Sequence, residues 1–127
     1  MDEKAATSDL QEKARQIRID IIKMLHAAGS GHSAGSLDMA DVFATMFFGN
    51  ILKYEPKEPE WDERDRLFLS CGHIAPVMYA TMSEAGYFPK EELLTLRKLG
   101  NRLQGHPERK KLSGVESTSG PLGSGLA

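Results

Sequence analysis

Only one stretch of this chain has the pattern of a buried β-strand, and this limits the fold more than any other feature. Residues 67–69 (Leu-Phe-Leu) form a short continuous apolar run between charged residues and a Ser-Cys-Gly sequence, as in a strand buried on both faces. The segments on either side have helical patterns. Because a complete α/β domain needs several parallel strands, we expect only the start of such a domain, mainly helical within this chain.

Two helices are expected before the strand. Over residues 10–28 apolar side chains recur every three or four positions, which places them on one helical face. Ser8 and Gln11 have capping-box spacing ahead of this helix, and Gly29 can end it. A loop rich in glycine and serine follows at residues 29–36. The second helix is expected to end near residues 49–50, and its apolar stripe is Met39, Val42, Phe43, Met46 and Phe47.

Two further helices are expected after the strand, each opened by a proline. Pro76 can occupy the first turn of a helix that ends near Gly86, and Pro89 can open another that ends before Gly100. From residue 100 onward no periodic pattern remains. The repeated glycines there predict tight turns or a ligand held close to the main chain. The apolar stripe expected in the last helix is Leu93, Leu96 and Leu99.

Length and composition exclude several classes of protein. The 127 residues can bury one core, and no apolar run approaches the ~18 residues of a membrane-spanning helix. With a net charge of −2 and one short basic cluster at residues 109–111, the chain is expected to bind neither nucleic acid nor a membrane. The start of the sequence lacks a signal-peptide pattern, and Cys71 is the only cysteine, so we expect a cytoplasmic protein.

Three of the four histidines follow a glycine directly in a predicted loop, namely His32, His73 and His106. Side chains that bind ligands concentrate in such loops, and histidine can hydrogen-bond a phosphate or a sugar hydroxyl and exchange a proton near pH 7. One such histidine alone would be more typical of an ordinary polar loop residue. Their spacing does not fit a local zinc motif. His26 lies inside the first predicted helix, where a packing or surface role is expected.

His73 is the strongest candidate for ligand binding, because it follows the predicted strand and precedes a helix. Backbone N–H groups at the start of that helix would favour an anion. The glycine-rich loop at residues 120–125 is a second candidate for an anion or cofactor, although it matches neither the Walker nor the dinucleotide pattern. The residues by themselves therefore indicate the start of an α/β domain with a candidate phosphate site.

Taken together, several short motifs resemble those of transketolases. They occur in the order and approximate spacing of that family and cover the chain from about residue 14 to its end. They are most similar to the amino-terminal subunit of split transketolases, in which two polypeptides divide the enzyme. The motifs lie at residues 30–32, 64–70, 72–73, 85–87, 105–108, 114–116 and 120–123.

The resemblance implies the start of a doubly wound α/β domain that binds thiamine diphosphate through a divalent ion, usually Mg²⁺. By this resemblance His73 would contact the diphosphate. His32 and His106 would be the catalytic residues, hydrogen-bonding sugar hydroxyls and assisting proton transfers. The cofactor rings would be lined by Gly120, Pro121 and Leu122.

The implied reaction is the transfer of a two-carbon ketol unit from a ketose phosphate to an aldose phosphate. The metal ligands of the family are expected beyond residue 127, and its catalytic glutamate in a different domain. We therefore expect residues 1–127 to form a partial domain with a flexible N-terminus at residues 1–9 that is inactive alone. The expected partners are a C-terminal transketolase subunit or segment, sugar phosphates and further copies in an oligomer.

Two other interpretations remain open. The chain could be a non-catalytic association module, which the missing metal segment favours and the three histidines oppose. It could also belong to a related thiamine-diphosphate enzyme, such as an oxo-acid dehydrogenase component or a deoxyxylulose phosphate synthase, which the motifs at residues 105–107 and 120–123 fit less well. Ser33, Cys71 and Ser124 depart from residues common in transketolases, but no motif histidine is lost.

Overall fold

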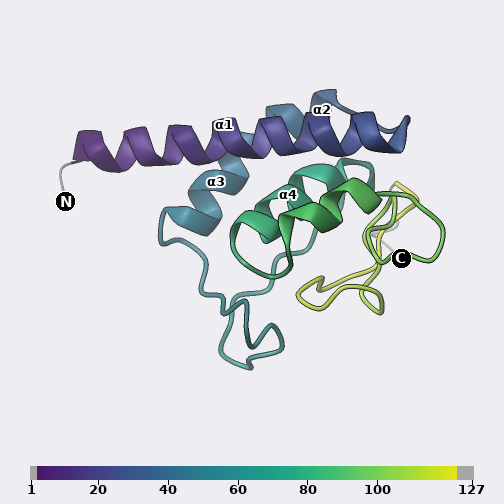
Figure 1. Ribbon diagram of the computed structural model, residues 1–127. Coiled ribbons are helices and arrows are strands. Elements are labelled where there is room, and N and C mark those ends of the chain that lie inside the picture. Colours follow the sequence, from purple (N-terminus) through teal and green to yellow (C-terminus); the bar gives the residue numbers. More distant parts are fainter. Residues whose placement is uncertain (1–2, 123–127) are drawn as a thin grey trace.

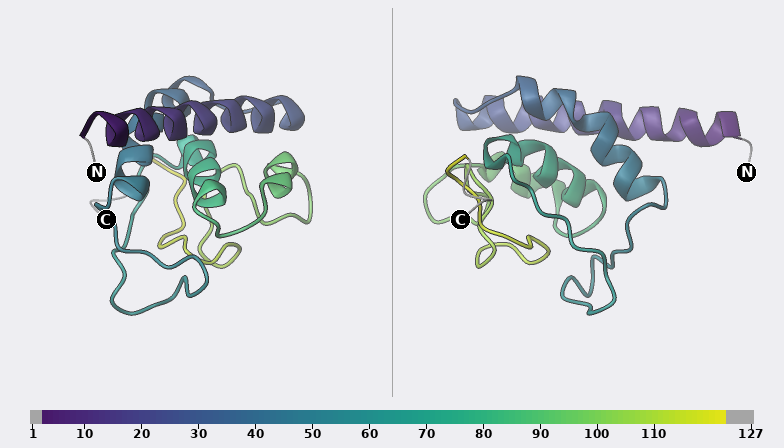
Figure 2. Two further views of the ribbon diagram at one scale, coloured as in Figure 1. Left: turned by 60° about the vertical axis from the view of Figure 1, so that its left-hand side comes forward. Right: turned by 180° about the vertical axis from the view of Figure 1, so that it is seen from behind.

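The computed structural model describes residues 3–122, and all regular elements in this part of the chain are helical. Helix α1 crosses over the other helices, while the long connection between α3 and η1 extends away from it (Figure 1, Figure 2). The prediction of a mainly helical chain is confirmed. The elements are α1 (Glu3–Ala28), α2 (Ala34–Asp38), α3 (Ala40–Phe48), the 3-10 helix η1 (Gly72–Ile74), α4 (Ala75–Glu84) and the 3-10 helix η2 (Lys90–Thr95).

Helix α1 packs its apolar face onto α3 and α4. Ala14, Ile17 and Ile21 on this face are at most 1% exposed, as their helical spacing predicts. Removing a buried aliphatic side chain of this kind typically costs ~2–5 kcal/mol of stability. Among the described residues no helix is long and apolar enough to cross a membrane.

The two ends of α1 differ in how well the sequence predicts them. The helix begins at Glu3, so the predicted start at Leu10 and the capping box at Ser8 are wrong. Residues 3–7 include glutamate, lysine and alanines, which favour helix and contain no breaker. Gly29 ends the helix as predicted, with φ of 67°. Its N–H donates to the carbonyl of Leu25 at 3.0 Å.

Helices α3 and α4 form the core beneath α1. Phe43 and Phe47 of α3 are buried, whereas Val42 is 45% exposed, so the buried stripe is narrower than predicted. Helix α4 has Pro76 in its first turn, as expected. Every residue from 75 to 83 is buried, which makes α4 the central element of this part of the chain.

The predicted strand at residues 67–69 is wrong. Residues 3–122 contain no strand, and this segment has no regular secondary structure. Leu67 and Leu69 pack against the core, while Phe68 between them is 63% exposed. A strand requires a neighbour whose backbone groups complete its hydrogen bonds, and none of the described residues supplies one.

Two predicted boundaries also need correction. The loop at residues 29–36 is shorter than expected, because α2 begins at Ala34 and buries Ser36. The segment opened by Pro89 is a 3-10 helix that stops at Thr95, and Leu99 is fully exposed at 103%. The backbone reverses before that leucine, since Arg97 has a φ of 62° and leaves the helical region.

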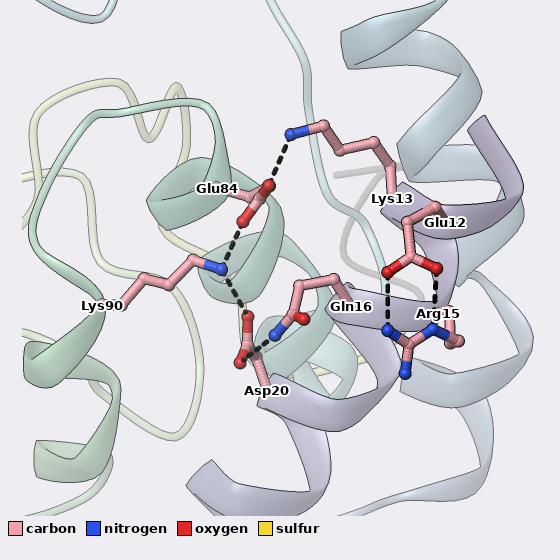
Figure 3. A network of polar contacts seen from close by, with 7 residues as sticks. All are labelled: Glu12, Lys13, Arg15, Gln16, Asp20, Glu84 and Lys90. Atoms are coloured by element: carbon pink, nitrogen blue, oxygen red, sulfur yellow. Dashed lines mark hydrogen bonds and ion pairs between the residues drawn. The ribbon is translucent and has the colours of Figure 1, made fainter. Parts of the chain in front are cut away.

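A network of charged side chains joins α1, α4 and the start of η2 (Figure 3). The Nζ atom of Lys13 lies 2.5 Å from Oε1 of Glu84, and Lys90 contacts the other carboxylate oxygen of Glu84. Lys90 also lies 3.3 Å from Oδ2 of Asp20, which accepts a hydrogen bond from Gln16 through Oδ1 at 3.0 Å. Burial favours a higher pKa for Glu84, but the two lysines outweigh it and its pKa is lowered.

Candidate functional site

His32, His73 and His106 come from three separate segments, and they line one cavity of about 160 Å³. The rings of His32 and His73 meet edge to face, with their centroids 5.5 Å apart. The fold therefore brings together the three histidines that the sequence singles out. Their individual chemical roles stay predictions.

The tight turn between α1 and α2 positions His32. Gly31 has a φ of 130°, and a Cβ atom there would lie 2.5 Å from Cδ2 of Leu25. Helix α2 then packs closely against η1, since a Cβ atom on Gly35 would lie 2.8 Å from Cγ2 of Ile74. The hydroxyl of Ser36 donates to the carbonyl of Ile74 at 3.4 Å. These contacts hold the loop of His32 against the segment that contains His73.

His73 lies in η1, directly before α4, where the N–H of Ala75 donates to the carbonyl of Gly72 and Pro76 has no N–H to donate. The preceding residue has to be small. A Cβ atom on Gly72 would lie 2.6 Å from the hydroxyl of Ser119 and 2.9 Å from Cδ2 of His106. Gly72 thus lets the segment of His73 approach both the loop of His106 and the end of the described chain.

A buried tyrosine fixes the loop that contains His106. Tyr79 of α4 is fully buried, and its hydroxyl donates to the carbonyl of Gln104 at 2.9 Å. Burial raises the pKa of Tyr79, so the phenol keeps the proton that it donates. The N–H of Ser119 donates to the carbonyl of Pro107 at 3.2 Å, which closes the loop on its other side.

The residues around the cavity fit a ligand that carries phosphate. The hydroxyl of Ser119 is buried and has no hydrogen-bond partner within residues 3–122, although such groups are normally satisfied. It lies beside Gly72, which precedes His73 and is also close to the ring of His106. Histidine rings and a serine hydroxyl can donate hydrogen bonds to phosphate oxygens.

A wider, open cavity of about 680 Å³ adjoins the first. Arg97, Gly105 and His106 line both cavities, so His106 lies where the two meet. A substrate that enters through the open cavity would therefore reach His106 at the edge of the histidine cavity. The other residues that line the open cavity are Gln104, Pro107, Glu108, Lys110, Thr118 and Ser119.

Some of the sequence candidates lie outside these cavities. Gly120 is partly buried, Pro121 is exposed and Leu122 is 74% exposed, and none of the three lines either cavity. Their role in cofactor binding stays a prediction. Residues 123–125 of the same loop lie outside the described residues. His26 is exposed on α1 away from the cavity, in agreement with the surface role considered for it.

Sequence reasoning missed two residues of the site. Ser119 precedes the glycine-rich loop but belongs to no pattern, and only the fold shows that its hydroxyl is buried without a partner. Arg97 was expected on a helix, whereas its left-handed backbone places it beside the histidine loops. No group of three or more His, Cys, Asp or Glu that could hold a metal ion occurs within the described part of the chain.

The fold and the cavity define the class of protein as a set of helices packed around one buried helix, with a cavity lined by three histidines and an arginine. Comparison with known families makes this specific. Residues 9–127 match the family described as "Transketolase, thiamine diphosphate binding domain", and the chain belongs to this family.

The transketolase of Rhodobacter capsulatus is 43% identical over 126 residues, which cover 98% of this chain and 19% of that protein. The 6-deoxy-6-sulfo-D-fructose transketolase subunit SqwG of a Clostridium species is 40% identical over 119 residues, or 94% of this chain and 43% of that protein. A crystal structure of transketolase from Pichia stipitis in complex with sedoheptulose-7-phosphate is 35% identical with a TM-score of 0.83, covering 92% of this chain and 17% of that one. The chain thus spans less than half the length of each of these relatives.

Proposed function

We propose that this chain supplies the N-terminal, cofactor-binding part of a transketolase. In this enzyme a two-carbon ketol unit passes from a ketose phosphate to an aldose phosphate. The observation that carries the proposal is the meeting of His32, His73 and His106 at one cavity in a chain of the transketolase family. When bound, thiamine diphosphate would supply the nucleophile and stabilise the carbanion of the reaction.

His73 would hold the diphosphate of the cofactor. It lies at the start of α4, where the helix dipole favours an anion. The buried hydroxyl of Ser119 would donate a hydrogen bond to the same group, since it lies beside Gly72 and has no partner in residues 3–122. The residues that follow directly along the chain, Gly120, Pro121 and Leu122, would line the rings of the cofactor.

His32 and His106 would act on the sugar. Both line the histidine cavity, and His106 also lines the open cavity through which a sugar would enter. Each ring nitrogen can donate a hydrogen bond to a sugar hydroxyl or accept one. Near neutral pH the same nitrogen can take a proton from a hydroxyl oxygen and return it, which the reaction requires.

The assembled enzyme would contain Mg²⁺, with its ligands in sequence beyond residue 127, and would be a cytoplasmic oligomer of the pentose phosphate pathway. Residues 1–127 would form a partial domain, completed by a C-terminal subunit or segment. The division of a transketolase activity into subunits, as the name of the Clostridium relative indicates, supports a partner chain. The sugar-phosphate complex of the Pichia enzyme supports the substrate class.

The test is to combine this chain with the remaining transketolase sequence, either fused or as a separate subunit. Transfer from a ketose phosphate to an aldose phosphate is then measured with thiamine diphosphate and Mg²⁺. We expect activity only when both parts are present. A complex that forms without ketol transfer would favour the association module, and transfer only with other substrates would favour a related thiamine-diphosphate enzyme. A matched control, His26→Ala, should assemble and react normally.

A further inference from the structure

Arg97 is the feature of the site for which neither the sequence motifs nor the proposed function provides a role. Its side chain lines the histidine cavity together with His32, His73 and His106, and it also lines the adjoining open cavity. Within residues 3–122 the guanidinium has no hydrogen bond or ion pair. Four other arginines pair with carboxylates: Arg15 with Glu12, Arg18 with Asp41, Arg64 with Glu116 and Arg102 with Glu92. Arg66 and Arg109, like Arg97, form no ion pair within residues 3–122.

The side chain of Arg97 lies against one glycine from each of two histidine loops. A Cβ atom on Gly105 would lie 3.5 Å from Nε of Arg97, so the stem of the arginine rests on the loop of His106. A Cβ atom on Gly31 would lie 3.9 Å from Nη1, so the guanidinium reaches the loop of His32. The positive charge is therefore located between the two loops that would act on the sugar.

The backbone at Arg97 is held in an uncommon conformation. Its φ is 62°, in the left-handed region that non-glycine residues rarely adopt, and its N–H donates to the carbonyl of Leu103 at 2.9 Å. Such conformations cost free energy and concentrate at functional sites, where the surrounding structure maintains them. Here the turn keeps Arg97 beside the cavity instead of continuing η2 toward solvent.

We propose that Arg97 binds a phosphoryl group at the histidine cavity. Its planar guanidinium carries N–H donors in a rigid fork that matches two phosphate oxygens. Among the described residues that line the two cavities, Glu108 is the only acidic one, and it lines the open cavity alone. An anion at Arg97 would therefore meet donors from the histidine loops and no carboxylate within the histidine cavity.

The inference rests on the proposed function, because both the cofactor and the sugar substrates carry phosphoryl groups. Arg97→Met removes the charge but keeps an apolar stem, and Arg97→Lys keeps the charge but loses the fork. Arg102→Met is the matched control, since this nearby arginine pairs with Glu92 and lines neither cavity. All variants are compared in the assembled enzyme. The measurements are the thiamine diphosphate affinity by calorimetry and the kcat and KM for an aldose phosphate and for the same aldose without phosphate.

We expect Arg97→Met to raise one dissociation or Michaelis constant by roughly ten- to a hundred-fold while kcat changes little, and Arg97→Lys to restore part of the loss. A rise in the cofactor constant identifies the diphosphate as the ligand. A rise in KM confined to the phosphorylated aldose identifies the sugar phosphate. Unchanged constants, or a KM that rises equally for both aldoses, would overturn the proposal. If the assembled wild type shows no ketol transfer, the proposed function fails, and calorimetry of wild type and Arg97→Met with inorganic pyrophosphate still tests Arg97.

Discussion

The polar groups at the two ends of helix α4 differ in whether they pair with one another. At the C-terminal end Glu84 contacts Lys13 and Lys90, and the charges of this network neutralise one another (Figure 3). At the N-terminal end the buried hydroxyl of Ser119 has no hydrogen-bond partner within residues 3–122, and the exposed side chain of Arg97 has no ion pair there. Both regions contact the same buried helix, so general packing does not explain the difference.

This difference separates a role in stability from a role in binding. Polar groups that satisfy one another hold elements together, whereas a buried group without a partner costs free energy unless a ligand satisfies it. Substitutions in the Glu84 network should therefore change stability and leave ligands unaffected. Substitutions around His73 should weaken ligand binding and leave stability nearly unchanged.

The largest expected effect is on turnover at the N-terminal end of α4. In the assembled enzyme His106→Ala, and likewise His32→Ala, should lower kcat by a factor of roughly a hundred or more, because a general acid or base is lost. Binding of thiamine diphosphate should be normal in both variants, as calorimetry can check. His26→Ala, on the exposed side of α1, should change neither quantity. Equal losses from all these substitutions would indicate unfolding, and the roles would have to be withdrawn.

The next effect is on cofactor affinity. His73→Ala should raise the thiamine diphosphate concentration needed for half-maximal activity by about ten-fold, the cost of one charge-assisted hydrogen bond. Turnover at saturating cofactor should be comparatively intact. Titration of activity against cofactor separates the two quantities. If His73→Ala binds the cofactor normally but has a low kcat, His73 has a catalytic role like that proposed for His32 and His106.

The C-terminal end of α4 should respond through stability. Glu84→Gln removes the charge that Lys13 and Lys90 share, and we expect a loss of about 1–2 kcal/mol in the free energy of unfolding, since both lysines are partly exposed. Urea denaturation of the chain measures this loss. The affinity for thiamine diphosphate in the assembled enzyme should not change. A change in that affinity would contradict the claim that the C-terminal end of α4 affects stability alone.

The same network predicts how stability depends on pH. Because the lysines lower the pKa of Glu84 in the folded chain below its ordinary value of 4.5, the folded state favours the ionised carboxylate. The resulting stabilisation is present above pH 4.5 and is lost as the pH falls through the lower, folded-state pKa. The difference in unfolding free energy between wild type and Glu84→Gln should therefore shrink below about pH 4.5. A constant difference down to pH 3 would contradict the lowered pKa.

The same comparison shows what the sequence can predict. The buried faces of α1 and α3, the proline that opens α4 and the histidine loops follow from local patterns, because helical period and turn chemistry act over a few residues. The state of residues 67–69 depends on a paired neighbour, which a local apolar run does not reveal. Arg97 and Ser119 could not be found either, since a left-handed backbone at an arginine and a hydroxyl without a partner arise only from tertiary packing.

The smallest expected effect concerns Tyr79, which lies in the middle of α4 and holds the loop of His106 through the carbonyl of Gln104. Tyr79→Phe keeps the buried ring and removes one hydrogen bond, so we expect stability to fall by about 1 kcal/mol. The loop would then be held less firmly, and kcat should fall a few-fold while cofactor affinity stays the same. Urea denaturation and steady-state kinetics measure the two quantities. If stability falls and kcat does not, the position of His106 depends on Gly72 and Ser119 rather than on the tyrosine.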